Sequence, residues 1–233
     1  MIEFLFLDLD DTILDFHKSE GIALSKVLRS LGVEPTEAVC SRYSEINLSF
    51  WKRLERKELT RDQVLVGRFA ALFEELGVKT DAAAAADAYA ENLGIGHYFL
   101  PGAEETVCAL AKKYKLYLAS NGTASVQSGR LKSADISKYF QDIFISQNMG
   151  ADKPDIRFFE AAFARIENFD PAKTMIVGDS LTSDIQGGIN AGIRTCWVNP
   201  QGKMADPAIT PDYEIRDITQ LEALLSHLDA NTP

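Results

Sequence analysis

The chain has 233 residues, 46% of them hydrophobic, which is enough for one large domain or two with a buried core. A formal net charge of −10 argues against nucleic-acid polymers and anionic membranes as partners, because both require a basic surface. The longest apolar runs, such as Ala82–Ala86, are too short to span a membrane, and because the chain starts directly with a predicted strand we expect no signal peptide. The cysteines number 3 and are widely spaced, so we expect reduced thiols in a cytoplasmic protein.

The first predicted element is a strand at Phe4–Leu7, an apolar run typical of a parallel sheet buried on both faces. Asp8 closes this strand and Asp10 lies two positions further on, so both carboxylates can reach one side of its carboxyl end. Open α/β sheets bind their ligands at that end. Two acids in one place repel each other, and this pattern favours a divalent metal.

The next segment, from Ser19 to about Leu93, shows helical periodicity without a strand. Thr60 is a predicted N-cap for a helix that runs to Leu76 and ends at Gly77, and Asp81 starts a fourth helix. Four helices in a row predict a bundle-like insertion.

From residue 103 onward, strands and helices alternate, which predicts a parallel sheet and an α/β fold. The predicted helices are 103–113, 124–133, 156–166, 182–191 and about 221–228, and the predicted strands are 115–119, 143–145, 174–177, 195–198 and 213–215.

Polar residues follow these later strands, as they follow the first. Ser120 and Asn121 end one strand, Asp179 ends another with Asp184 close behind, and Lys153 precedes a helix. Each residue alone is typical of a turn, a helix start or a solvated surface. Their shared order at successive strand ends favours one common site.

These motifs resemble those of the haloacid dehalogenase-like (HAD) superfamily, in the expected order and over nearly the whole chain. The four motifs are Asp8 to Thr12, Ser120, Lys153, and Gly178 to Asp184. The resemblance implies a doubly wound parallel sheet with an inserted, all-helical cap domain. We expect the discontinuous core at 1–16 and 99–233 and the cap at 17–98.

The residue types suit phosphate ester hydrolysis. Asp8 would attack phosphorus and form an aspartyl-phosphate, and Asp10 would protonate the leaving alcohol and then deprotonate water. Ser120 would hold the phosphoryl oxygens, while Lys153 offsets their charge. Asp10 also argues against a dehalogenase, because halide leaves without protonation.

We predict Mg²⁺ as the cofactor, because its hard oxygen ligands are available at two strand ends. The predicted metal-binding residues are Asp8, Asp10, Asp179 and Asp184, the last of them acting directly, through water or by orienting the site. Thr12 and Asn121 are counted as substrate-binding candidates beside the phosphate, although Thr12 is expected chiefly to fix the turn after Asp10.

The cap is similar to that of noncanonical pyrimidine 5′-nucleotidases in its runs 46–51, 54–60, 68–69 and 72–77. This resemblance implies a nucleoside monophosphate as the small phosphorylated substrate. Trp51 and Phe50 would stack on a pyrimidine and Asn47 would bind its edge. The alternative for Phe50 and Trp51 is packing within the cap itself.

Other functions share these motifs. Phosphatases of sugar phosphates, phosphoglycolate or N-acylneuraminate 9-phosphate have related caps, and a mutase of the β-phosphoglucomutase kind keeps the same core. A phospho-receiver domain also holds acids, a hydroxyl and a lysine on a parallel sheet. A receiver, however, has about 120 residues and no helical insertion. The sequence makes no prediction of oligomeric state.

Overall fold

The computed structural model describes residues 1–230. The chain divides into two compact units, one built from Met1–Phe16 with His97–Pro233 and one from His17–Gly96. The expected boundary lay two residues later, before residue 99, and residues 231–233 of the expected core lie outside the described residues. Residues 98 and 99 are tied to the loop after the first strand, where the Asp15 N–H donates to the Tyr98 carbonyl at 2.7 Å and Leu14 pairs with Phe99.

The first unit is built on a parallel sheet whose six strands, within residues 1–230, lie in the order β3-β2-β1-β4-β5-β6. The strands are β1 (Phe4–Leu7), β2 (Lys115–Ser120), β3 (Asp142–Ile145), β4 (Thr174–Gly178), β5 (Arg194–Val198) and β6 (Tyr213–Ile215). Every pairing is parallel, and Leu7 stands beside Leu118 on one side and Val177 on the other. Chain order reverses beside β1, the position where doubly wound sheets bind ligands. The predicted fold class is confirmed.

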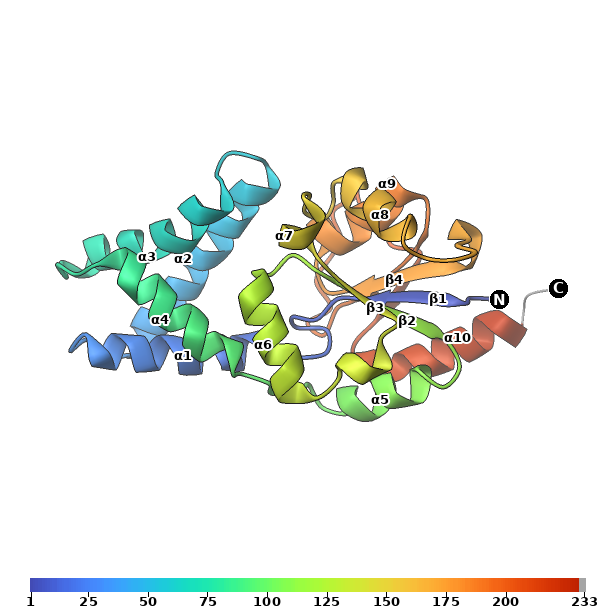
Figure 1. Ribbon diagram of the computed structural model, residues 1–233, viewed down its shortest axis with the longest axis horizontal. Helices are drawn as coiled ribbons and strands as arrows, with labels where there is room; N and C mark the ends of the chain where they lie inside the picture. The colour runs from blue at the N-terminus through green and yellow to red at the C-terminus, as the bar shows by residue number, and fades with distance from the viewer. Residues whose placement is uncertain (231–233) are drawn as a thin grey trace. The chain divides into compact units, whose positions relative to one another are not determined.

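Helices cover both faces of this sheet (Figure 1). In β1, Phe4 and Phe6 pack with α8 (Ile156–Phe163), and α9 (Gln186–Ala191) covers the same face. Leu5 and Leu7 point to the opposite face, where they pack with α5 (Ala103–Leu110), α6 (Ala124–Ala134) and α10 (Leu221–Ala230). Because neighbouring residues of a strand alternate between faces, this uninterrupted apolar run is buried on both sides.

The second unit consists of four helices, counted within the described residues: α1 (Phe16–Ser30), α2 (Glu37–Glu55), α3 (Arg61–Leu76) and α4 (Ala82–Gly94). Helix α1 begins one residue before this unit, at Phe16. Thr60 and Gln63 form a reciprocal capping box at the start of α3, and Gly77 ends that helix in the left-handed conformation. Asp81 caps α4 as predicted. The rings of Tyr43, Phe69 and Tyr89 form an aromatic core between α2, α3 and α4.

Several helices of the sheet unit differ from their predicted limits. The helices α5 and α8 end about one turn early, and a short helix, α7 (Ser146–Met149), occupies a stretch for which none was expected. The predicted helix 182–191 begins as a π-helical turn, Leu181–Ile185, before α9. Such turns occur often at functional sites.

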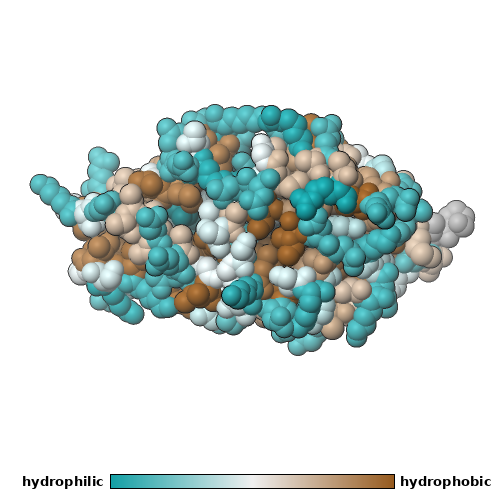
Figure 2. Space-filling view, viewed as in Figure 1, coloured by the Kyte–Doolittle hydropathy of each residue, from teal (hydrophilic) through white to brown (hydrophobic). Residues whose placement is uncertain are grey.

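Figure 2 shows a face on which hydrophilic side chains predominate and hydrophobic side chains form smaller groups. None of the described helices is both long and apolar enough to cross a membrane.

Candidate active site

Asp8 stands at the carboxyl end of the central strand. It continues the register of β1, and its N–H donates to the Val177 carbonyl of β4 at 2.9 Å. The residue is only 7% exposed. A rigid strand on each side therefore fixes the position of this carboxylate, as a reacting group requires.

Lys153 reaches Asp8 from the loop before α8. Its ammonium donates to Asp8 Oδ1 at 2.7 Å, to Asp184 Oδ1 at 2.6 Å and to the Ala119 carbonyl. The side chain is buried, and each of the three N–H donors of a lysine has a partner. The ammonium is thus held as a fixed charge beside the predicted nucleophile.

Asn121 holds the backbone of Lys153. Its Oδ1 accepts from the Lys153 N–H and its Nδ2 donates to the Lys153 carbonyl, both at 2.8 Å. The sequence predicted Asn121 as a substrate-binding residue. In the structure its side-chain amide positions the lysine, and direct binding of substrate by Asn121 remains a prediction.

Three carboxylates lie close together here, and two of them, Asp8 and Asp184, pair with Lys153. One oxygen each of Asp8, Asp179 and Asp184 lies within 4.8 Å of the others. Asp179 follows β4, and its backbone carbonyl accepts from Trp197 Nε1 at 2.8 Å. Asp184 lies in the π-helical turn, where its Oδ2 accepts from the Ser180 N–H at 3.1 Å.

The electrostatics of the cluster show that one ammonium does not balance three acids. Burial raises the pKa of Asp8 to about 8, and the charges of Asp184 and Asp10 act in the same direction against Lys153. Burial and the charge of Asp8 raise the pKa of Asp179 well above its usual value. Burial alone would lower the pKa of Lys153, but Asp184 and Asp8 raise it above the usual value for lysine.

These residues fit a divalent cation. Clustered carboxylate oxygens are the donors that Mg²⁺ prefers, and a bound cation would offset both the burial and the mutual repulsion that raise the pKa values of Asp8 and Asp179. The predicted metal site is supported by three of its four predicted residues. The Asp10 carboxylate belongs to a different set of contacts, and its part in metal binding remains a prediction.

Asp10 is held by two side chains of α6. Its Oδ2 accepts from Gln127 Nε2 at 2.7 Å and its Oδ1 accepts from an Arg130 N–H. Gln127 Nε2 also donates to Ser120 Oγ at 2.8 Å. The predicted acid/base residue and the predicted phosphate-binding hydroxyl are therefore joined through one amide nitrogen.

Gln127 and Arg130 were not among the site residues predicted from the sequence. Both are buried, Arg130 with no exposed surface. The available signal was their spacing of three residues, which places them on one helix face just after the Ser120 motif. A pair of polar residues on the inward face of a short helix suggests candidate site residues, although the spacing does not show that Asp10 is the residue they contact.

Thr12 is fully buried, and its hydroxyl has no hydrogen-bond partner within residues 1–230. Its predicted contact with substrate remains a prediction.

The predicted base-binding residues all lie on α2 in the helical unit. Asn47 is 4% exposed, and its amide donates to Glu20 and accepts from Arg68, both at 2.7 Å. Phe50 and Trp51 are half-buried. The Phe50 ring lies against Gly67, where an added Cβ would be 2.6 Å from a ring carbon, and the guanidinium of Arg61 lies 5.4 Å from the centre of the Trp51 ring.

Comparisons with known proteins agree with this geometry. The family model for haloacid dehalogenase-like hydrolases matches residues 2–192. The HAD-hydrolase YfnB of Bacillus subtilis is 38% identical over 95% of this chain and 94% of its own. The pyrimidine 5′-nucleotidase PynA of Streptococcus pneumoniae is 37% identical over 98% of this chain and 96% of its own.

A crystal structure of YfnB bound to magnesium superposes with a TM-score of 0.92, over 96% of this chain and 98% of that one. An L-2-haloacid dehalogenase from Xanthobacter autotrophicus shares the fold at a TM-score of 0.77 and 17% identity. The order of the motifs, the site at the end of β1 and these similarities lead to one assignment. The chain belongs to the haloacid dehalogenase-like hydrolases.

Proposed function

We propose that the protein is a Mg²⁺-dependent phosphate monoester hydrolase that acts through an aspartyl-phosphate on Asp8. The observation that carries this proposal is the pairing of the buried Asp8 carboxylate with Lys153 inside a cluster of acids. A carboxylate nucleophile and an anionic phosphate approach each other only where positive charge offsets both. Mg²⁺ held by Asp8, Asp179 and Asp184 would supply the remaining positive charge when bound.

The reaction would proceed in two steps. A carboxylate oxygen of Asp8 forms a bond to phosphorus as the bond to the ester oxygen breaks, and Asp10 gives its proton to the leaving alcohol. Asp10 then takes a proton from water as the water oxygen attacks phosphorus, which releases inorganic phosphate and restores Asp8. Throughout, Lys153 remains beside Asp8, and the Ser120 hydroxyl binds a phosphoryl oxygen.

For the substrate we propose a pyrimidine nucleoside 5′-monophosphate. The support is the similarity to PynA and to YjjG of Escherichia coli, a pyrimidine 5′-nucleotidase that is 29% identical over 96% of this chain. Both similarities include the helical unit as well as the sheet unit, so they extend beyond the motifs that HAD phosphatases share. Of the predicted base-binding residues, Phe50 and Trp51 are half-buried, whereas Asn47 is buried and engaged by Glu20 and Arg68.

The test is phosphate release from a panel of esters with Mg²⁺ present. UMP, dUMP and dTMP should have a higher kcat/KM than AMP and GMP by about 10–100-fold, the value of one stack and one hydrogen bond. A clear preference for a sugar phosphate, phosphoglycolate or N-acylneuraminate 9-phosphate would contradict the proposed nucleotide substrate. The proposal that the protein is a phosphatase would still hold. Conversion of one sugar phosphate into its isomer without phosphate release would instead identify a mutase.

A further inference from the structure

We propose that Gln127 is a positioning residue for two groups of the reaction at once, the acid/base Asp10 and the phosphate-binding hydroxyl of Ser120. This inference rests on the proposed phosphatase chemistry. It concerns a residue outside the four motifs, on the helix that follows the second of them.

The amide of Gln127 is fully engaged by its neighbours. Its Nε2 donates to Asp10 Oδ2 at 2.7 Å and to Ser120 Oγ at 2.8 Å, while its Oε1 accepts from Arg130 at 3.2 Å. Arg130 has no acceptor and Asp10 lies on the opposite side, so the two neighbours determine which end of the amide carries the nitrogen. The side chain is 1% exposed and is therefore held in one orientation.

This contact determines the direction in which the Ser120 hydroxyl can donate its proton. Ser120 Oγ accepts from Gln127 Nε2 at 2.8 Å and from the Gly122 N–H at 3.1 Å. A hydroxyl has two acceptor lone pairs and one proton to donate. With both lone pairs occupied by N–H donors, the remaining proton is directed to a third partner. An anionic phosphoryl oxygen is the partner that such a donor suits.

Arg130 helps to hold both Asp10 and Gln127 in place. It donates to Asp10 Oδ1 and to Gln127 Oε1 through one nitrogen, and its guanidinium lies 5.8 Å from the centre of the Phe16 ring. Asp10 thus has a partner on each carboxylate oxygen, although its side chain is 29% exposed. The carboxyl group is held in one plane while part of it stays accessible to a leaving group.

Glycine at position 122 is consistent with this packing. A Cβ added there would lie 2.4 Å from Gln127 Nε2. The close approach lets the backbone N–H of residue 122 and the Gln127 amide reach the same serine oxygen.

The test compares two aryl phosphates of nearly equal size. Phenyl phosphate needs a proton on its leaving oxygen much more than p-nitrophenyl phosphate does, so the ratio of their kcat/KM values reports acid assistance by Asp10. In Gln127→Leu, kcat/KM for phenyl phosphate should fall about 10–100-fold, the cost of a catalytic group misplaced by about 1 Å. The value for p-nitrophenyl phosphate should fall several-fold less, and the inhibition constant for inorganic phosphate should rise because Ser120 loses its orientation.

A double-mutant cycle ties the effect to Asp10. In the Asp10→Asn background, adding Gln127→Leu should leave the ratio of the two esters unchanged within about twofold, because the coupled partner is already absent. Gln127→Met, a second apolar replacement of similar length, should reproduce the result. It also provides the measurement if thermal denaturation shows that Gln127→Leu does not fold.

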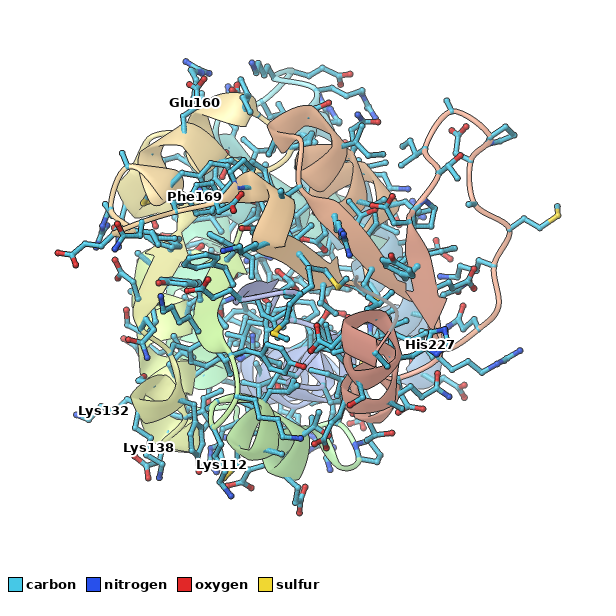
Figure 3. All side chains as sticks on the ribbon, turned by 90° about the vertical axis from the view of Figure 1, so that its right-hand side faces the viewer. Lys112, Lys132, Lys138, Glu160, Phe169 and His227 are labelled. Atoms are coloured by element: carbon cyan, nitrogen blue, oxygen red, sulfur yellow. The ribbon has the colours of Figure 1, made fainter. Side chains whose placement is uncertain are left out.

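Two controls lie on or beside the same helix. Lys132 points away from the sheet into solvent (Figure 3), so Lys132→Met should keep the wild-type ratio. Gln147 accepts from the Ala124 N–H at the start of α6 at 2.8 Å, so Gln147→Leu perturbs this helix without touching Asp10. A folded Gln127 variant with the wild-type ratio, or an equal change in Gln147→Leu, would overturn the positioning role. A wild-type protein inactive on both esters would overturn the phosphatase proposal together with it.

Discussion

Replacing Gly178 by alanine should disable the site by displacing the Asp184 carboxylate, although no charged residue is itself replaced. Gly178 ends β4, and an added Cβ would lie 2.2 Å from Asp184 Oδ2 and 2.3 Å from its Cγ. Ordinary contact begins at 3.4 Å, so the carboxylate must retreat by 3.4 − 2.2 = 1.2 Å. That displacement takes Asp184 out of range of the Ser180 N–H and weakens its pair with Lys153.

The magnitude follows from these contacts. Breaking a buried ion pair on one side costs about 3–5 kcal/mol, and the lower value applies here because Lys153 keeps Asp8 as a partner. We therefore expect the melting temperature to fall by about 6–12 °C for a chain of this size. A shift of about 1 Å in a group that positions the site should reduce kcat about 10²-fold.

The assay is hydrolysis of p-nitrophenyl phosphate over a Mg²⁺ titration, together with thermal denaturation of the same samples. Gly21→Ala is the matched control, since Gly21 lies within α1 and no atom comes within 4 Å of an added Cβ. Alanine there should stabilise the protein by about 0.5–1 kcal/mol and leave kcat unchanged. Wild-type kcat and melting temperature in Gly178→Ala would refute the argument that Asp184 requires a glycine opposite it.

Four further results are expected. EDTA should abolish hydrolysis and Mg²⁺ should restore it, and full activity in excess chelator would contradict the metal site. Asp179→Asn removes one of three clustered acidic groups, so without metal the melting temperature of the variant should rise by about 2–4 °C, equivalent to about 1 kcal/mol. Mg²⁺ should no longer stabilise this variant. A metal-induced rise in melting temperature like that of the wild type would be evidence against Asp179 as a ligand. Asp8→Asn should form no phosphoenzyme, while Asp10→Asn should still accumulate some from p-nitrophenyl phosphate; normal turnover of nucleotides by Asp10→Asn would remove its proton-transfer role. Trp51→Ala should reduce the preference for pyrimidine over purine monophosphates about tenfold and spare p-nitrophenyl phosphate, and an unchanged preference would exclude stacking on Trp51.

The local elements of this protein could be read from its sequence because their causes are local. Apolar runs predicted the strands of the sheet, and β1 is buried on both faces as its unbroken apolar run indicated. Thr60, Gly77 and Asp81 were predicted as helix ends, and each occupies the predicted cap. A capping side chain forms its hydrogen bond within a few residues of itself, so a short stretch of sequence contains both partners of the interaction.

The four motifs were also visible in the sequence, because a residue that directly follows a strand in a parallel sheet must lie at the carboxyl edge. Asp8 and Asp179 directly follow their strands and Ser120 is the last residue of β2, so all three are placed at this edge. The family resemblance predicted that Asp8, Asp179 and Asp184 share one site, and the pairing of β1 with β4 in the structure brings them together.

The tertiary structure alone decided how these groups are held. Asn121 was predicted as a substrate-binding residue, and only the structure shows that its amide holds the backbone of Lys153, 32 residues away. Asp10 was predicted as an acid/base and metal-binding residue, and only the structure shows that its carboxylate pairs with Arg130, 120 residues away. Such contacts depend on which strands become neighbours and on how far each helix is rotated about its axis, and no local periodicity encodes either. Sequence determines which residues reach the edge of the sheet, and packing determines which of them meet.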